Sequence, residues 1–183
     1  CAGIETFIMN MYRHIDRTQI QFDFLVHYSQ PQFYDDEIEK LGGRIYRFSV
    51  REDNNFIKYF KDLGKFFREH KEYTIVHAHM ESFAMFYLPF VKKAGIPVII
   101  AHSHIDKADP NFKGFIKNLM NQFFKYLATD YMACSEEAAK FLFGNKKCFI
   151  LRNAIDTDKF DFNEKIRSKV RVELGLEGKF VVG

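Results

Sequence analysis

The sequence has few cysteines, and none of them is placed to hold a fold together. Its 183 residues include only Cys1, Cys134 and Cys148. There is no C-x-x-C spacing and no nearby histidine pair at zinc-finger distance, which excludes a disulfide framework and a structural zinc site of that kind. A reducing, cytoplasmic location fits this usage. We expect Cys134 and Cys148 to be small buried residues in strands.

Other absences narrow the class further. Lys plus Arg number 27 and Asp plus Glu 24, so the net charge of 27 − 24 = +3 does not indicate a nucleic-acid partner. The longest apolar run, 83–91, contains Pro89 and is shorter than the ~20 residues that a bilayer span needs. No Walker A loop, nucleophile elbow, H-E-x-x-H helix or full G-x-G-x-x-G motif is present.

What the sequence has instead is an alternation of short runs rich in β-branched or aromatic residues and longer segments with helical periodicity. Predicted strands cover 21–27, 44–50, 73–79, 97–102, 130–134, 148–151 and 179–182, and predicted helices cover 4–15, 33–41, 54–70, 81–94, 111–128, 135–144 and 163–174. Such alternation is typical of parallel strands joined by right-handed crossovers. The predicted fold class is therefore α/β, a doubly wound, Rossmann-like parallel sheet.

The length predicts one domain and little more. The opening turn, 1–3, is of a kind that normally follows a first strand, and the predicted strand 179–182 stops on Gly183. We therefore expect a domain over 1–175 that lacks its first strand, and the start of a further domain at 176–183. The strands 21–27 and 73–79 would then lose a partner. Either the segment 179–182 or a second copy of the chain, in a dimer, could occupy the position of the missing first strand.

Histidines gather where ligands bind in open α/β sheets, at the carboxyl ends of strands. Five of the seven lie there: His27, His77, His79, His102 and His104. His77 and His79 alternate along one strand and so share a face, where either a structural or a functional role is open. His102 and His104 leave the most buried strand and are better candidates. A zinc site on them would need Asp106 or His79 as well, and no spacing fixes these ligands, so no metal is expected.

Three further loops follow predicted strands or precede helices. Ala2-Gly3 comes before a helix start, whose free N–H groups can bind phosphate, although a simple tight turn explains it equally well. Ser135-Glu136 and the segment 153–156 also follow strands. The paired carboxylates at 35–36 and 136–137 begin helices, where the macrodipole stabilises them.

The predicted helix at 111–126 is both apolar and basic. Phe112, Phe115, Ile116, Leu119 and Phe123 form a stripe, with Lys113, Lys117 and Lys125 beside it and Phe124 widening it. One interpretation is a core-facing helix with solvated lysines. The other is a helix that lies in a membrane interface.

Five segments, in this order, look like motifs of one known family. They are the turn 2–7, like Gly-Gly-x-Glu; the His-x-His strand 73–79; the strand 97–104 ending in histidine; the Ser-Glu step 133–136; and 152–156 with Phe160, like Pro-Asn-Gly-hydrophobic-Asp…Phe. The chain resembles the N-terminal domain of GT-B glycosyltransferases of family 4, which build capsular, exopolysaccharide and lipopolysaccharide sugars. It departs from the pattern at Ala2, Arg152 and Ala154, and in having Tyr73 or Thr74 in place of Asp.

The resemblance implies a bacterial, cytoplasmic hexosyltransferase, which could sit peripherally at the inner face of the membrane through 111–126. Two Rossmann-like domains would face each other across a cleft, the C-terminal one holding a nucleotide-sugar donor such as a UDP- or GDP-sugar. The N-terminal one would shape the site of a polysaccharide, lipid-linked or lipopolysaccharide acceptor. No metal, other cofactor or nucleic acid is implied. The donor-gripping residues would lie in the C-terminal domain, so this chain alone should be inactive.

The same resemblance assigns roles to individual residues. His104, or else His102, would approach the transferred sugar or the acceptor as the catalytic histidine. Gly3 and Ala2 would lie beside the donor diphosphate or the acceptor. The remaining donor- or acceptor-binding candidates are His79, Ser135, Asn153 and Asp156. Two alternatives stay open: a nucleotide-sugar epimerase of the same architecture, and a non-enzymatic α/β binding module.

Overall fold

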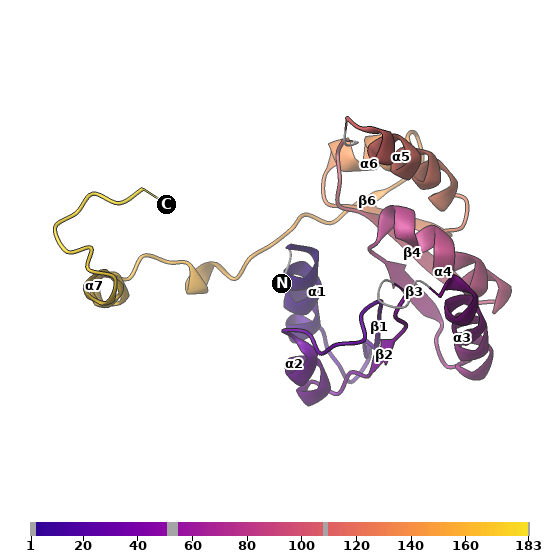
Figure 1. Cartoon of the computed structure of the whole chain (residues 1–183), viewed down its shortest axis with the longest axis horizontal. Coiled ribbons are helices and arrows are strands. Elements are labelled where there is room, and N and C mark those ends of the chain that lie inside the picture. Colours follow the sequence, from indigo (N-terminus) through magenta and orange to yellow (C-terminus); the bar gives the residue numbers. More distant parts are fainter. Residues whose placement is uncertain (1–2, 51–54, 108–109, 183) are drawn as a thin grey trace. The chain divides into compact units, whose positions relative to one another are not determined.

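The structure, a computed structural model, describes residues 3–50, 55–107 and 110–182. The chain forms two compact units, Cys1–Asn153 and Ala154–Gly183, which are treated separately below. The larger unit contains all the strands of the described residues and carries the candidate site (Figure 1). The smaller unit contains one short 3₁₀ turn and one helix.

Helices and strands alternate through the larger unit, as the sequence predicted. In chain order the elements are α1 (Gly3–His14), β1 (Phe24–Val26), α2 (Asp35–Lys40), β2 (Ile45–Arg47), α3 (Phe56–Glu69), β3 (Ile75–Ala78), α4 (Glu81–Lys93), β4 (Val98–Ser103), α5 (Phe112–Phe124), β5 (Asp130–Ala133), α6 (Glu136–Phe143) and β6 (Phe149–Ile150), followed in the smaller unit by η1 (Thr157–Lys159) and α7 (Glu164–Glu173). Most strands are shorter than their predicted ranges because only their central residues join a ladder.

All paired strands are parallel, which confirms the α/β class. They fall into a four-stranded sheet in the order β3-β4-β5-β6 and a two-stranded sheet, β1-β2. Among the described residues no ladder joins β1 to β3, the two strands that the sequence analysis expected to lose a partner. The predicted strand at 179–182 is wrong, because this segment joins no ladder among the described residues and Phe180 is almost fully exposed.

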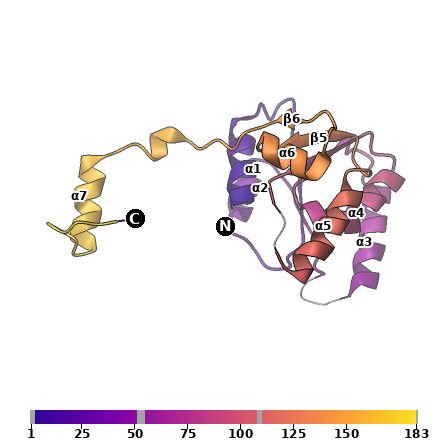
Figure 2. The same ribbon diagram turned by 90° about the horizontal axis from the view of Figure 1, so that it is seen from above.

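The core lies between the four-stranded sheet and a row of helices in which α3, α4, α5 and α6 contact one another in turn (Figure 2). Ile99 and Ala101 alternate along β4 and point into this core, as do Ala78 of β3 and Ala133 of β5. Leu88 and Val91 of α4 are fully buried in the same cluster. One face of the central strands is therefore sealed by apolar packing, which leaves the other face for polar side chains.

A second, smaller core holds α1 against α2. It consists of Met9, Tyr12 and Ile38, all buried. The Tyr12 hydroxyl donates to the Leu41 carbonyl at 3.1 Å and accepts from the Gln21 amide at 2.5 Å. These contacts position α1 beside the β1-β2 pair.

Helix ends follow the chemistry expected of caps. Asn55, Asn111, Ser135 and Asn163 each accept a hydrogen bond from a backbone N–H in the first turn of their helix. Ser135 and Gly144 are the first and last residues of the helix predicted at 135–144, and they lie at the two ends of α6, where Gly144 has a φ of 63°.

Two predictions about side-chain environment need correction. Cys134 and Cys148 are only half-buried, and they lie just outside β5 and β6 rather than within them. In α5 the stripe from Phe112 to Phe123 faces solvent, so the core-facing interpretation is wrong. The side of α5 that is buried carries Gly114, Asn121 and Phe124.

We predict that Gly43→Ala destabilises the fold. A Cβ at Gly43 would lie 2.8 Å from the Tyr12 hydroxyl oxygen, 2.9 Å from the Phe22 carbonyl oxygen and 3.0 Å from Ile38 Cγ2. The Phe22 oxygen belongs to the backbone and cannot swing aside, so overpacking should cost about 1–3 kcal/mol in urea unfolding. Gly3→Ala is the control, since a Cβ there meets none of the described residues within 4 Å beyond its own neighbours in α1. Equal stability of the two variants would contradict the prediction.

Candidate functional site

Four histidines from two neighbouring strands form a single cluster. His77 and His79 come from β3 and the residue after it, and His102 and His104 come from β4 and the residue after it. The parallel register places His77 opposite Ile100, and continuing it places His79 opposite His102. Because side chains alternate along a strand, all four imidazoles lie on the face opposite the apolar core. The sequence prediction that His77 and His79 share a face is confirmed by a centroid distance of 4.1 Å.

The cluster, here named the histidine quartet, consists of two hydrogen-bonded pairs that lie against each other. One pair joins His77 Nε2 and His102 Nδ1 at 3.0 Å, and the other joins His79 Nδ1 and His104 Nε2 at 3.0 Å. Within the first pair the ring planes are nearly parallel, with an interplanar angle of 8°. Between pairs, the His102 and His104 rings stack with centroids 4.3 Å apart. Each hydrogen bond runs diagonally, to the histidine two residues beyond the position directly opposite.

Helix α1 covers the histidine quartet through a single aromatic side chain. The ring of Phe7 meets His79, His102 and His104 edge-on, at centroid distances of 6.2, 5.4 and 5.6 Å. Phe7 is itself buried. Gly3 is the first residue of α1 and lies one turn before Phe7, so the N-terminus of this helix, with its free N–H groups, is one turn from the quartet.

Burial keeps the quartet neutral. Burial, and secondarily charge repulsion from His104, lowers the pKa of His77 to about 4 and that of His102 to about 3. Burial, together with the other three rings, holds the pKa of His79 well below its usual value. Burial also lowers the pKa of His104. At neutral pH the four imidazoles therefore act as hydrogen-bonding groups that each carry one N–H and one acceptor nitrogen.

The two histidines predicted to be catalytic differ in access. His102 is fully buried and its Nε2 has no hydrogen-bond partner among the described residues, so it cannot touch a substrate in this arrangement. His104 is only partly buried and lies just beyond the end of β4. Of the two, His104 alone is placed to meet a bound molecule, while His102 can act by orienting its neighbours.

The other predicted residues do not join the quartet. Ser135 and Asn153 line a separate cavity of about 490 Å³ with Cys134, Glu136, Glu137 and Arg152. The Ser135 Oγ is already engaged as the cap of α6, at 3.1 Å from the Ala138 nitrogen. Asp156 belongs to the smaller unit and pairs with Lys159 at 3.2 Å. Ala2 lies outside the described residues.

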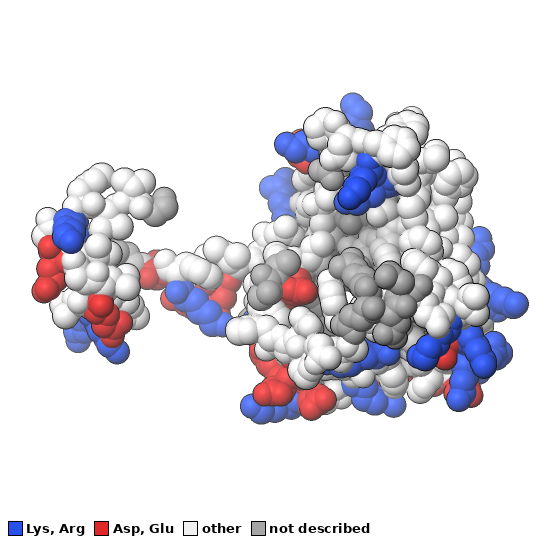
Figure 3. Space-filling view, in the orientation of Figure 1, with Lys and Arg blue, Asp and Glu red and all other residues white. Residues whose placement is uncertain are grey.

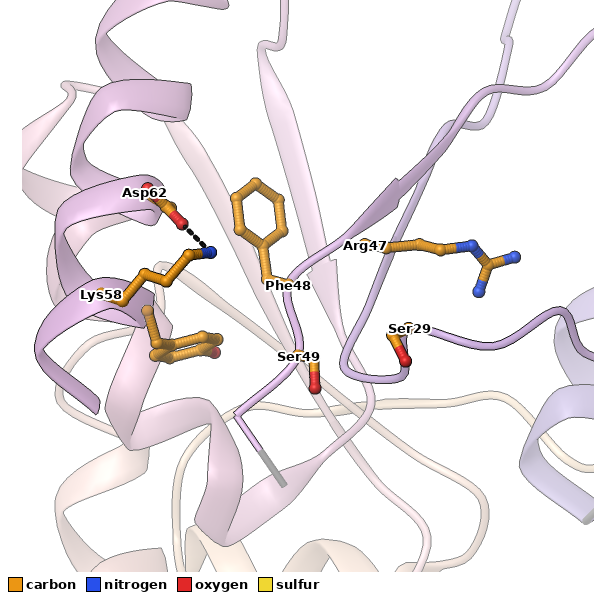
Figure 4. A pocket seen from close by; sticks show the side chains of 7 residues that line it. Ser29, Arg47, Phe48, Ser49, Lys58 and Asp62 are labelled. Atoms are coloured by element: carbon orange, nitrogen blue, oxygen red, sulfur yellow. Dashed lines mark hydrogen bonds and ion pairs between the residues drawn. The ribbon is translucent and has the colours of Figure 1, made fainter. Parts of the chain in front are cut away.

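A further cavity, of about 250 Å³, lies beyond the ends of β1 and β2 and was missed in the sequence. Ser29 and Ser49 present hydroxyls to it, and Lys58 and Asp62 form an ion pair of 2.9 Å on one side of Phe48 (Figure 4). Arg47 lies on the other side, points away from that pair and binds Asp35. The rule that ligands meet strand ends covers Ser29 and Ser49 as well as the histidines, and applying it to every strand would have found them.

The surface adds two observations. In Figure 3 the visible Lys and Arg side chains of the larger unit lie mostly toward the edges of that face. Among the described helices, none combines the length and apolar character needed to cross a membrane.

The fold and the site define a parallel α/β domain with a polar cluster at the carboxyl edge of its sheet and a helix N-terminus beside it. A family model described as Glycosyltransferase Family 4 matches residues 2–159. The chain belongs to that family.

Particular relatives agree with this assignment. The chain is 31% identical, over a 194-residue alignment, to EpsF of Bacillus subtilis (strain 168), which its name assigns to the glycosyltransferases. That alignment covers 100% of this chain and 50% of EpsF. Crystal structures of Anabaena Alr3699/HepE, in complex with UDP and glucose or with UDP, share the fold at 13% identity, with TM-scores of 0.61 and 0.58. They cover 84% and 85% of this chain, which spans about half the length of these relatives.

We predict that acid weakens the fold through the histidine quartet. Above pH ~6.5 the histidines are neutral in both the folded and the unfolded chain, so they add no pH dependence. Below it the unfolded chain takes up protons that the folded chain refuses, so stability falls until the folded pKa, about 4 for His77, is reached. Each such histidine contributes a slope of about 1.4 kcal/mol per pH unit.

The measurement is urea unfolding between pH 4 and 7 in a chelator-containing buffer, which keeps metal ions off the imidazoles. His77→Gln should reduce the slope of unfolding free energy against pH by about 1.4 kcal/mol per pH unit, the contribution of one proton. His14→Gln, which alters a histidine on the exposed face of α1, should leave that slope unchanged. Identical slopes for His77→Gln and the unchanged chain would show that the quartet does not drive the acid response.

Proposed function

We propose that this chain is the acceptor-side domain of a glycosyltransferase that moves a sugar from a nucleotide-sugar donor to a polysaccharide, lipid-linked or lipopolysaccharide acceptor. The observation that carries the proposal is the histidine quartet beside the N-terminus of α1, at the carboxyl edge of the sheet, in a member of Glycosyltransferase Family 4. The relative named EpsF supports transfer as the reaction. The HepE complexes with UDP and glucose support a UDP-sugar among the donors.

The proposed division of labour follows from access and charge. His104 approaches the transferred sugar or the acceptor hydroxyl, and His79, bonded to it at 3.0 Å, fixes the ring orientation. Gly3 adds no side chain at the start of α1, and apart from its chain neighbours and the backbone of α1 no described atom lies within 4 Å of where its Cβ would be. A donor diphosphate or an anionic acceptor could reach the free N–H groups there. Most donor contacts come from a second domain.

The polar cavity beyond β1 and β2 suits part of the acceptor. Its hydroxyls on Ser29 and Ser49 and its Lys58–Asp62 pair offer both donors and acceptors of hydrogen bonds, as a sugar requires. Like the quartet, the cavity lies at the carboxyl ends of parallel strands, where ligands bind in open α/β sheets. It therefore belongs with acceptor recognition in this proposal.

We place the protein peripherally at the inner face of the membrane through α5. Phe112 and Phe115 are 76% and 65% exposed, and Lys113 and Lys117 lie exposed beside them. Exposed phenylalanines flanked by lysines suit the surface of a bilayer with acidic lipids. The phenylalanines can enter the apolar acyl region while the lysines meet the anionic headgroups. A lipid-linked acceptor would be met at the same surface.

Transfer is tested with the complete polypeptide that carries this chain and a second domain. We expect it to transfer from a UDP- or GDP-sugar to a lipid-linked or glycan acceptor, and we expect the 183-residue chain alone to transfer nothing. His104→Ala should lower the rate by about 10²-fold or more, in the range of a lost general acid or base. His14→Ala should leave the rate unchanged.

Three outcomes would count against this proposal. Turnover by the 183-residue chain alone would contradict the division between domains. Interconversion of the nucleotide-sugar without an acceptor would indicate an epimerase. Full activity of His104→Ala would remove the proposed role of that residue.

Membrane contact is tested by co-sedimentation of the chain with vesicles. We expect binding to vesicles that contain phosphatidylglycerol, weaker binding to phosphatidylcholine alone, and loss of binding as salt is raised. Phe112→Ser and Phe115→Ser should each weaken binding by about tenfold, since burying a phenylalanine stabilises by about 1.5–3 kcal/mol. Phe33→Ser, at a phenylalanine that is 79% exposed outside α5, is the control. Equal loss in the control would exclude a specific role for α5.

A further inference from the structure

The histidine quartet has a property that glycosyl transfer does not explain. His77, His79 and His102 each offer a ring nitrogen, and these three atoms lie within 4.8 Å of one another. Nε2 of the fully buried His102 has no hydrogen-bond partner among the described residues. A buried imidazole nitrogen left without a partner is costly, and such an atom in a folded protein calls for a bound group.

The spacing is close to what a metal ion requires. Zinc binds imidazole nitrogens at about 2.0–2.1 Å, so two nitrogens on one tetrahedral ion lie about 3.4 Å apart. The ligand nitrogens that His77, His79 and His102 offer lie within 4.8 Å of one another. Closing onto an ion therefore needs ring movements of about 1 Å, which rotation of the imidazoles about their side-chain bonds provides. The backbone need not move.

We infer that His77, His79 and His102 bind one divalent transition-metal ion of the zinc type. Three imidazoles without a carboxylate or a thiolate suit Zn²⁺, Co²⁺, Ni²⁺ and Cu²⁺, and they do not suit Mg²⁺ or Ca²⁺, which take oxygen ligands. Three protein ligands leave one position for water or for an oxygen of a bound molecule.

The surroundings support the ligands. The β3-β4 ladder holds His77 and the residues next to His79 and His102. It therefore fixes the backbone positions from which these imidazole rings extend. His79 keeps a partner for its Nδ1 in His104 at 3.0 Å, which orients the ring in the way that metal-ligating histidines usually need. Phe7 contacts the rings of His79 and His102 from α1 and provides an apolar wall.

This inference reverses an expectation drawn from the sequence. A metal was set aside there because nothing fixed the spacing of the histidines or supplied a third ligand. The fold supplies both, through strand register. The inference does not depend on glycosyl transfer, because its readout is metal binding and needs neither donor nor acceptor.

The experiment is titration of the 183-residue chain, purified without a histidine tag and stripped with a chelator, with Zn²⁺ by calorimetry and with Co²⁺ by visible absorption. We expect one ion per chain and, with Co²⁺, the intense visible bands of a four-coordinate site. Mg²⁺ should give no heat. His77→Gln and His79→Gln should each weaken Zn²⁺ binding by at least about 10–100-fold, the loss that removing even a supporting partner brings.

The matched controls are His14→Gln and His70→Gln, which remove histidines outside the quartet, and circular dichroism shows that every variant is folded. Retained one-to-one binding in both controls, with loss in His77→Gln and His79→Gln, supports the site. Absence of a stoichiometric ion in the unchanged chain would overturn it. So would equal binding by His77→Gln, or loss of binding in His14→Gln or His70→Gln.

Discussion

The parallel ladder between β3 and β4 is the constraint on which the rest of the structure depends. It fixes which residue of one strand lies opposite which residue of the other. Because side chains alternate, this one register sends Ala78, Ile99 and Ala101 into the apolar core and the histidines to the opposite face. A slip of one residue would reverse both sets, burying imidazoles among aliphatic side chains and exposing the core. Packing and chemistry are therefore fixed by the same backbone hydrogen bonds.

The face that carries the histidines is costly to build. Four imidazoles are removed from water, and burial lowers the pKa of each. Two inter-ring hydrogen bonds and edge contacts with Phe7 offset part of this cost, but Nε2 of His102 has no partner within the described part of the chain. Departures from full hydrogen-bond satisfaction are expected at functional sites. The quartet thus marks the place where the sheet is adapted to bind something.

Much of the fold was accessible from the sequence because its signals are local. Hydrophobic periodicity located the helices, Ser135 marked the start of α6, and Gly144 marked its end. The failures came where the outcome depends on partners distant in the chain. The segment 179–182 has strand-like residues but no ladder to join, and the stripe of α5 has the periodicity of a core face yet points to solvent. Periodicity shows that a helix has an apolar side, but it does not show what lies against that side.

For the candidate site, the sequence by itself determined the residue types and the edge of the sheet where they gather. It placed His77 with His79 and His102 with His104, since alternation along a strand is a property of the backbone alone. Only the tertiary structure decided that the two pairs meet, that His102 is fully buried while His104 is not, and that Phe7 covers them. The reason is physical: contacts between strands depend on register, and register is set by the packing of the whole sheet rather than by either strand.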